Sequence, residues 1–455
     1  MQMLSRNDYM KLLDKYRNLY AMYVEYPHKS IWNANFTDAS VRQAVEAHVT
    51  KLGNPPMLLY VHIPFCKMQC YYCTCHTTIT RSYDRVKDYL KYLYAEIELI
   101  HALFQEYGTK PNIKEIHLGG GSPTLLQRQE FDELISQLER ISDFSYIDEF
   151  TIEVDPRAIT VETLKYYHSK GLDRLSFGVQ EFDPEVQKTI NRVQPASLLE
   201  GLLTPEIRDL FHGINFDIMW GLPKQTRASF QKTLDTLLKI SPDRVSLLLL
   251  HYAPKVKKHQ TMIKESDLPD LYDRTLMFHD AVEKLTGNGY VRIGLEHFAK
   301  PEDDLAKALK NKTAGWNSLG YTAGRYRNII GIGTGSASTI ANNYYFQNTY
   351  ELKEYKDLIL KNTFPVFRGY KLNLDETIRR ELIQRLRVYF TLDFTEFGNA
   401  NNIIFKKYFA SEMNQLEEFV SDGILEIDDG SMRVTALGKF FTMQICRKFD
   451  RNITD

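Results

Sequence analysis

The sequence predicts an α/β fold: an incomplete (β/α)6 TIM-like barrel with an N-terminal extension and a C-terminal, mainly helical, winged-helix-like domain. From about residue 57, short apolar runs alternate with helical patterns, which is typical of βα units that build a parallel sheet. After about residue 370 this alternation gives way to helical stretches and one hairpin. At 455 residues the chain exceeds one average domain, so two or three compact units are expected.

The barrel is expected to begin with the apolar run 57–62. Residues 83–107 follow with hydrophobic side chains at helical spacing. Further runs have the composition of strands, and helical stretches such as 229–240 lie between them; these runs are 114–118, 150–154, 174–178, 214–219 and 245–250. Barrel chemistry usually sits on loops after the carboxyl ends of strands, so residues at these ends are the site candidates.

We expect three segments: an N-terminal extension over the active site (1–56), the partial barrel (57–365) and the winged-helix-like domain (366–455). The extension holds one predicted helix, 8–20. The C-terminal domain combines helices at 376–389, 414–422 and 436–449 with a hairpin that turns at Asp429-Gly430. On a neutral chain, such a module is more typical of a lid or packing domain than of a DNA reader.

Composition excludes several classes of protein. Lys and Arg number 57 against 58 Asp and Glu, a net charge of −1, so no nucleic-acid partner is expected. Charged residues interrupt the N-terminus, which therefore resembles neither a signal peptide nor a membrane anchor. No apolar run is long enough to span a bilayer. We expect a cytoplasmic protein without a membrane partner.

Four of the five cysteines lie within ten residues: Cys66, Cys70, Cys73 and Cys75. The C-x3-C-x2-C spacing supplies three thiolates from one tight loop, which suits a [4Fe–4S] cluster with one open iron. A structural zinc site commonly needs two separated ligand pairs, and the sequence has no second pair. Disulfides this close together would cross-link little chain and would be unusual without a secretory signal. The iron–sulfur interpretation is favoured.

Other candidate residues follow the predicted strands. The glycine run 119–121 would let the backbone approach a ligand, although a plain tight turn has the same sequence. Glu153 lies at the end of the third predicted strand and Asp155 follows it, where a carboxylate either faces the barrel mouth or caps a helix. Asp217 lies among apolar residues of the fifth strand, and burying such an acid without a partner is costly.

Some residues stay open between a structural and a functional role. Arg192 can pair with a carboxylate, but its sequence context equally fits an ordinary surface arginine. Cys75 is a spare ligand, an inert buried thiol or an active-site residue. Gln180 ends the fourth predicted strand. Cys446, on the last predicted helix, is expected to be a small core residue.

The cysteine run resembles the signature of the radical S-adenosylmethionine superfamily, in which an aromatic residue, here Tyr72, precedes the third cysteine. Cys75 stands where a related haem-chaperone branch has an aromatic residue. Further motifs are similar to one family, the oxygen-independent coproporphyrinogen III oxidases (dehydrogenases), and extend over nearly the whole chain. They include Tyr60-Val-His-Ile-Pro-Phe-Cys66, Gly119-Gly-Gly-Ser-Pro-Thr124, Ile152-Glu-Val-Asp-Pro156, Gly178-Val-Gln-Glu-Phe182, Gly221-Leu-Pro-Lys-Gln-Thr226, Glu296-His-Phe-Ala299 and Val434-Thr-Ala-Leu-Gly438.

The resemblance implies a radical enzyme. It would convert two propionates of coproporphyrinogen III to vinyls by oxidative decarboxylation, giving protoporphyrinogen IX. The implied cofactors are a [4Fe–4S] cluster and two molecules of S-adenosylmethionine, which yield a 5′-deoxyadenosyl radical. The expected partners are the porphyrinogen and an electron donor such as flavodoxin or ferredoxin, without nucleic acid or membrane. A monomer is expected.

Carried over position by position, the resemblance also implies residue roles. Cys66, Cys70 and Cys73 would ligate the cluster, and Cys75 would be a catalytic residue that does not bind iron. The first S-adenosylmethionine would be lined by Tyr60, Gly120, Glu153 and Ala337. The second would be lined by Tyr72, Gly121, Ser122, Gln180, Arg192 and Asp217, with His251 in its wall.

The chain departs from the family pattern at substrate and second-cofactor positions, while the cysteine run is intact. The departing residues are Met22, His251, Ser318, Leu319, Arg325 and Arg327. One interpretation is drift of the binding site, with an arginine of the last pair neutralising propionates. Another is a paralogue that transfers a methyl or methylene group to haem or another substrate. A third is a haem-trafficking protein, against which Cys75 argues.

Overall fold

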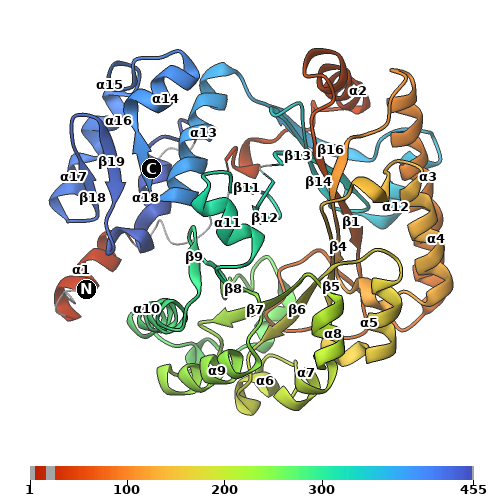
Figure 1. Ribbon diagram of the computed structural model, residues 1–455, viewed down its shortest axis with the longest axis horizontal. Coiled ribbons are helices and arrows are strands. Elements are labelled where there is room, and N and C mark those ends of the chain that lie inside the picture. The colour runs from red at the N-terminus through yellow and green to blue at the C-terminus, as the bar shows by residue number, and fades with distance from the viewer. Residues whose placement is uncertain (1–5, 17–25, 325, 453–455) are drawn as a thin grey trace. The chain divides into compact units, whose positions relative to one another are not determined.

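The computed structural model describes residues 6–16, 26–324 and 326–452 and contains two compact units (Figure 1). The barrel unit comprises Asn33–Tyr290 and Tyr326–Lys371. The second unit gathers Met1–Trp32, Val291–Arg325 and Leu372–Asp455. Each compact unit thus combines segments that are distant in sequence. The division at residues 56 and 365, and the position of the extension over the active site, stay predictions.

Six parallel strands follow one another in chain order in the barrel unit, which confirms the predicted βα alternation (Figure 1). Their bounds differ from the predicted ones by one or two residues. They are β1 (Met57–Ile63), β4 (Ile113–Gly120), β5 (Glu149–Val154), β6 (Arg174–Gln180), β7 (Gly213–Trp220) and β8 (Arg244–Leu249).

Helices connect these strands, as the 3.6-residue periodicity predicted. The longer ones are α3 (Tyr83–Gln105), α4 (Arg128–Glu139), α5 (Val161–His168), α9 (Arg227–Ile240) and α10 (Leu271–Gly287). The shorter ones are α6 (Pro184–Thr189), α7 (Ala196–Leu202) and α8 (Pro205–Leu210). Two further helices of the barrel unit are α2 (Asp38–Glu46), before β1, and α12 (Leu352–Ile359), in the later chain. Thr226 begins α9 with a capping box, since its hydroxyl accepts from the Ser229 N–H and the Ser229 hydroxyl accepts from the Thr226 N–H.

The sheet continues beyond β1 with strands that the sequence did not reveal. β13 (Asn328–Ile332) pairs in parallel with β1, and three antiparallel strands follow it. These are β14 (Ala337–Ile340), β15 (Tyr344–Asn348) and β16 (Val366–Lys371). Pairing between segments about 270 residues apart leaves no local pattern, which is why hydrophobic periodicity missed it.

Side chains alternate along the barrel strands. On β5, Phe150, Ile152 and Val154 are buried apolar residues, while Glu149, Thr151 and Glu153 occupy the positions between them. The polar positions of neighbouring strands share one face, because the amide of Asn215 donates to the hydroxyl of Ser176 at 2.9 Å. The barrel interior is therefore polar, and the apolar positions form the core on the other face.

Glu149 forms ion pairs with Arg174 and Arg244 in one layer at the amino end of the strands. Its Oε2 lies 2.8 Å from Nε of Arg174 and 3.3 Å from Nη1 of Arg244. Burial alone would raise the pKa of Glu149, but the two guanidinium charges lower it to about 2. Glu153 lies four residues further along β5, roughly 13 Å away at the rise of a strand, so this layer is separate from the mouth of the barrel.

The second unit begins with α1 (Arg6–Lys15) and is otherwise made of later chain. Tyr16, directly after α1, stacks on Phe419 with ring centroids 5.1 Å apart. The predicted helix 8–20 is confirmed over 8–15; residues 17–20 lie outside the described residues, as do Met22 and Arg325. Among described residues, no helix has the length and apolarity needed to cross a bilayer.

The C-terminal part of the second unit is mainly helical with a small sheet ordered β17-β19-β18, as the winged-helix-like prediction requires. The predicted hairpin is β18 (Leu425–Ile427) and β19 (Ser431–Val434). The predicted last helix is divided into η9 (Gly438–Phe441) and α18 (Thr442–Arg447), and Cys446 is buried on it as expected. The other elements are β9 (Val291–Ile293), β10 (His297–Ala299), α11 (Asp304–Lys310), β11 (Gly315–Asn317), β12 (Gly320–Thr322), α13 (Leu374–Tyr389), β17 (Thr391–Asp393), α14 (Phe394–Asn401), α15 (Phe405–Tyr408), α16 (Ala410–Gln415) and α17 (Glu417–Ser421).

Glu96 on α3 is a buried carboxyl that joins the helix to the late strands. Its Oε2 accepts from the N–H of Gly333 at 2.7 Å and from the hydroxyl of Tyr355 at 2.5 Å. Its Oε1 accepts from the amide of Asn348 at 2.6 Å. Burial raises the pKa of Glu96 to about 7, and these hydrogen bonds only partly offset the effect.

This pKa makes the stability of the protein pH-dependent. Folding raises the pKa above its unfolded value near 4.5, so the contribution to stability is complete below that pH and is lost as the pH rises through about 7. The loss amounts to about 3 kcal/mol, at about 1.4 kcal/mol per pKa unit. In Glu96→Gln the side chain stays neutral, and this part of the slope should disappear. Thermal unfolding of anaerobic holoprotein between pH 5 and 8 measures it.

The matched control is Glu98→Gln, two residues along α3 on the half-exposed side of the helix. It should keep the wild-type slope. Equal slopes in wild type and Glu96→Gln would contradict the assignment of the pH dependence to Glu96.

Candidate active site

A cavity of about 610 Å³ lies at the carboxyl ends of the barrel strands, where the sequence placed the candidate residues. Its size is typical of small-molecule sites. The structure brings thirteen of the predicted site residues to its lining. They are Cys66, Cys70, Tyr72, Cys73, Cys75, Gly120, Gly121, Ser122, Glu153, Gln180, Arg192, Asp217 and His251.

Residues 66–75, here called the cysteine loop, leave the barrel after β2 (Phe65–Cys66), which pairs with β3 (Thr78–Ile79). All four of its thiols are free. Burial raises the pKa of Cys66 to about 12. A hydrogen bond with Cys75, together with nearby cations, lowers that of Cys73 to about 7. Metal binding would deprotonate the ligating thiols outright, because a coordinating cation stabilises the thiolate.

Side chains from distant segments hold the backbone carbonyls of the cysteine loop. Asn191 donates its amide to the carbonyl of Gln69 at 2.8 Å. A segment after β8, here called the clamp (residues 257–260), supplies three further donors. Their contacts are Gln260 Nε2 to the carbonyl of Tyr72 at 3.1 Å, His259 Nε2 to that of Cys73 at 2.7 Å, and Lys257 Nζ to that of Cys75 at 3.2 Å. The loop is thus fixed although it has almost no regular secondary structure of its own.

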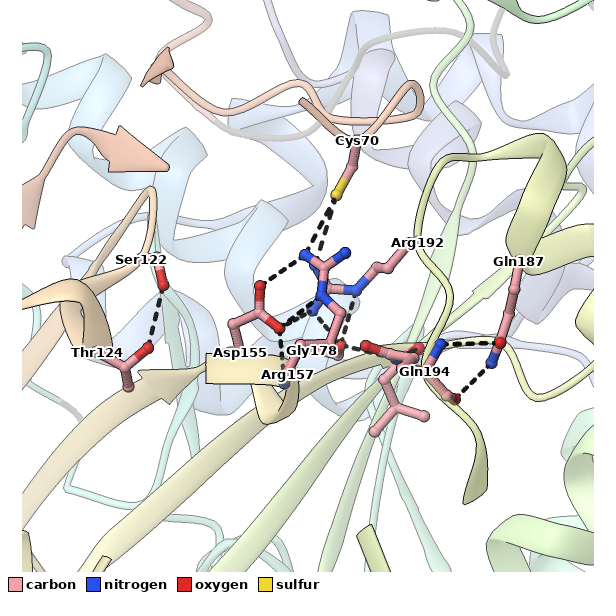
Figure 2. A network of polar contacts seen from close by, with 10 residues as sticks. Cys70, Ser122, Thr124, Asp155, Arg157, Gly178, Gln187, Arg192 and Gln194 are labelled. Atoms are coloured by element: carbon pink, nitrogen blue, oxygen red, sulfur yellow. Dashed lines mark hydrogen bonds and ion pairs between the residues drawn. The ribbon is translucent and has the colours of Figure 1, made fainter. Parts of the chain in front are cut away.

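Arg192 lies inside the site, so the interpretation as a surface arginine is wrong. Only 7% of the residue is exposed. Its guanidinium donates to the carbonyl of Gly178 through Nε at 3.1 Å and Nη2 at 2.5 Å, and Nη1 lies 3.5 Å from Sγ of Cys70. Figure 2 shows this group and that of Arg157 converging on the same sulfur atom.

Glu153 is held ionised next to the glycine run. Nε2 of His117 donates to its Oε1 at 3.1 Å, and the N–H of Gly120 donates to its Oε2 at 3.1 Å. Burial works against the charge, but these hydrogen bonds and the His117 charge lower the pKa of Glu153. A Cβ on Gly119 would lie 2.6 Å from Oε1 of Glu153, so a larger residue there would displace the carboxylate. The ligand-binding interpretation of the glycine run stays a prediction.

Two further lining residues are unusual, Gln180 in its backbone conformation and Asp217 in its pKa. Gln180 has φ +69°, a left-handed conformation that costs energy outside glycine, and its Oε1 is buried without a hydrogen-bond partner among described residues. Asp217 accepts from the amide of Asn215 at 2.9 Å. Burial and the neighbouring charge of Glu153 raise the pKa of Asp217 to about 6. Both groups offer acceptors to a cationic or hydrogen-bonding ligand.

The residues present fit the implied cofactors. Four free thiols from one loop border the cavity, and a cluster with an open iron requires three. The ionised Glu153 suits an ammonium group, and the orphaned Oε1 of Gln180 lacks a donor that a ligand would supply. When bound, a cluster would be held by Cys66, Cys70 and Cys73, and S-adenosylmethionine by the walls around it.

Two predicted residues do not line the cavity. The hydroxyl of Tyr60 lies 3.0 Å from Nδ1 of His62, in the layer beneath Gly119. Ala337 begins β14, where its backbone packs on Gly331. Their roles toward S-adenosylmethionine stay predictions, as do those of all the site residues.

Sequence reasoning missed the groups that support the site: His117, Arg157 and the clamp. His117 could have been found, because it is a polar residue at an inward position of β4. Arg157 follows the capping Asp155 by two residues, and Asp155 does cap η6 (Pro156–Ala158) by accepting from the N–H of Arg157 at 3.1 Å. Nothing local marks the clamp, which acts more than 180 residues away from its partners.

The departing positions are dispersed. His251 lines the cavity. Ser318 and Leu319 form the turn between β11 and β12 of the second unit. Arg327 precedes β13 in the barrel unit.

Comparison with known proteins agrees with this site. Residues 60–237 match the model of the Radical SAM superfamily. The chain is 35% identical to the oxygen-independent coproporphyrinogen III oxidase of Salmonella typhimurium over 442 residues, covering 97% of this chain and 94% of the relative. It is 34% identical to the Escherichia coli K12 protein of the same name, with the same coverage.

A solved structure is also similar over nearly the full length. It is described as "Coproporphyrinogen III oxidase (HemN) from Escherichia coli is a Radical SAM enzyme". The TM-score is 0.89 at 33% identity, and 97% of this chain and 99% of that one are covered. This match confirms the partial-barrel fold with its helical C-terminal region. The chain belongs to the oxygen-independent coproporphyrinogen III oxidase family of the radical SAM superfamily.

Proposed function

We propose that this protein catalyses the oxidative decarboxylation of two propionates of coproporphyrinogen III to vinyls, giving protoporphyrinogen IX without oxygen. The observation that carries the proposal is one cavity lined by the four free cysteines of the cysteine loop, an ionised glutamate and a buried arginine. It lies in a chain about a third identical, over almost its whole length, to enzymes of that name.

When bound, the cluster and S-adenosylmethionine supply a 5′-deoxyadenosyl radical able to take a hydrogen atom from the β-carbon of a propionate. Each propionate then breaks its bond to the carboxylate, releases carbon dioxide and one electron, and becomes a vinyl group. The electron passes to an external one-electron acceptor.

The chain's own residues bind and orient. Cys66, Cys70 and Cys73 hold the cluster from a loop whose carbonyls are fixed by the clamp. Glu153, kept ionised by His117, binds the amino group of the first S-adenosylmethionine. Asp217 and Arg192 bind a second molecule, because one acid and one guanidinium suit an amino acid moiety.

Further partners follow from the same chemistry. We propose a low-potential one-electron carrier such as flavodoxin or ferredoxin as donor, a monomer, and a cytoplasmic location. Nucleic acid and membrane play no part in the proposal. The methyl-transferase and haem-trafficking alternatives receive no support from the names of the relatives reported above, which match over nearly the full length of the chain.

The first test is product analysis. Anaerobically reconstituted enzyme is incubated with reductant, S-adenosylmethionine and coproporphyrinogen III, and the porphyrinogen is analysed by mass. The expected result is two successive losses of carbon dioxide with two hydrogens each. Cleavage to 5′-deoxyadenosine with untouched porphyrinogen would reject this substrate, and methylation with release of S-adenosylhomocysteine would indicate the transferase.

Separate serine substitutions test the cysteine roles. Cys66→Ser, Cys70→Ser and Cys73→Ser should each abolish the absorption near 400 nm, because each removes a cluster thiolate. Cys75→Ser should keep the chromophore and iron content but lose turnover. Anaerobic absorption spectra with iron analysis measure the first effect and product mass the second. Bleaching of Cys75→Ser would show that the ligand assignment is wrong.

Asp217→Asn tests the second wall. With its pKa near 6, Asp217 is a carboxylate above that pH and protonated below it, so wild-type kcat/KM should fall as the pH drops through about 6. The variant should lose this acidic limb and roughly 10- to 100-fold in kcat/KM, the range expected when a charged acceptor is removed. Asp209→Asn, at an exposed position of α8, is the control and should keep the wild-type profile. An unchanged limb in Asp217→Asn would exclude Asp217 as its source.

A further inference from the structure

We propose that Arg157 is a positioning residue that, together with Arg192, raises the reduction potential of the cluster through Cys70. The inference rests on the proposed function, since it needs a cluster bound at the cysteine loop. Its basis is that two guanidinium groups reach one sulfur atom (Figure 2). Nη1 of Arg192 lies 3.5 Å and Nη2 of Arg157 lies 3.9 Å from Sγ of Cys70.

The contacts are one-sided. Among the residues that the structure describes, both arginine–sulfur contacts fall on Cys70, and neither falls on Cys66 or Cys73. The two guanidinium charges would therefore lie beside one corner of the cluster, the corner that Cys70 ligates. Hydrogen bonds and charge at a ligating sulfur are a main determinant of cluster potential.

Arg157 is held for this contact by Asp155. Its Nε lies 2.9 Å from Oδ1 and its Nη2 lies 2.6 Å from Oδ2, a forked pair that fixes the plane of the guanidinium. Asp155 is fixed in turn, because it caps η6 at the end of β5. The remaining nitrogen, Nη1, is buried without a hydrogen-bond partner among described residues, so the carboxylate does not satisfy the whole group.

The sign of the effect follows from the charges. Arg157 and Arg192 contribute two positive charges, and Asp155, whose Oδ1 lies 3.7 Å from Nη2 of Arg192, contributes one negative charge. The three side chains are only 9 to 19% exposed, so solvent screens them weakly. A net positive charge beside a thiolate ligand stabilises the reduced cluster, which carries one more electron. The network should therefore make the cluster easier to reduce.

A merely structural role makes a different prediction. If the pair of Asp155 and Arg157 only shaped the chain after β5, its loss would change stability and iron loading without a directed change in potential. The midpoint potential of the loaded cluster separates the two, because it compares oxidised and reduced forms of the same folded protein.

The experiment is an EPR-monitored redox titration of anaerobic holoenzyme without S-adenosylmethionine. In Arg157→Gln the midpoint should fall. At the potential that reduces half of the wild-type cluster, the ratio of reduced to oxidised cluster in the variant should be about tenfold lower. This corresponds to a midpoint potential about 59 mV lower for a one-electron couple. Arg157→Lys keeps the charge without the fork and should fall by less. Asp155→Asn removes the negative charge beside both guanidinium groups, and its midpoint potential should rise. Arg128→Gln, on α4 over the ring of Tyr166, should match wild type.

An unchanged midpoint in iron-loaded Arg157→Gln would overturn the inference, as would a fall in Asp155→Asn. Where Arg157→Gln fails to load iron, Arg157→Lys and Asp155→Asn decide, since opposite shifts support the inference and equal or absent shifts overturn it. Failure of the proposed function looks different. Wild type would then assemble no cluster, or would hold the cluster with its tuned potential while leaving coproporphyrinogen III intact.

Discussion

Everything in the site depends on holding a loop of ten residues that must present three thiolates to one cluster. Such a loop cannot satisfy its own backbone, and buried carbonyls without donors are costly. Here the donors come from Asn191 after α6 and from the clamp after β8. Tyr72 adds an anchor by packing on an apolar cluster that contains Met219 and Leu250. The loop is thus fixed by chain that also builds the cavity walls.

The polar interior of the barrel explains how acids with different charge states coexist on β5 and β7. Glu149 pairs with two guanidinium groups, which lower its pKa. Glu153 meets an imidazole and a backbone N–H and stays ionised. Asp217 has only neutral donors and lies near Glu153, so its pKa rises. Burial is common to all three, and the partner decides the outcome. The mouth of the barrel therefore offers one fixed anion and one acid that titrates.

Much of this could be predicted from the sequence, and the limit has a physical cause. The six central strands, the hairpin at Asp429-Gly430 and the cysteine loop are local patterns, and periodicity or spacing reveals them. The strands β13 to β16, the clamp and Arg157 depend on contacts between distant segments, which no local pattern records. Arg192 illustrates the same limit. The sequence around a single arginine is the same whether its side chain is solvated or buried in contact with a sulfur atom.

The departures from the family pattern are compatible with an intact radical site because of where they lie. Of the described departing residues, only His251 lines the cavity, and its backbone carbonyl accepts from the clamp residue Gln260 at 2.8 Å. Ser318 and Leu319 belong to the second unit, whereas every residue lining the cavity belongs to the barrel unit. Substitution at such positions leaves the cysteine loop, Glu153 and the arginines untouched. The departures therefore fall on other residues than the cysteines, Glu153 and the arginines, on which the proposed radical chemistry depends.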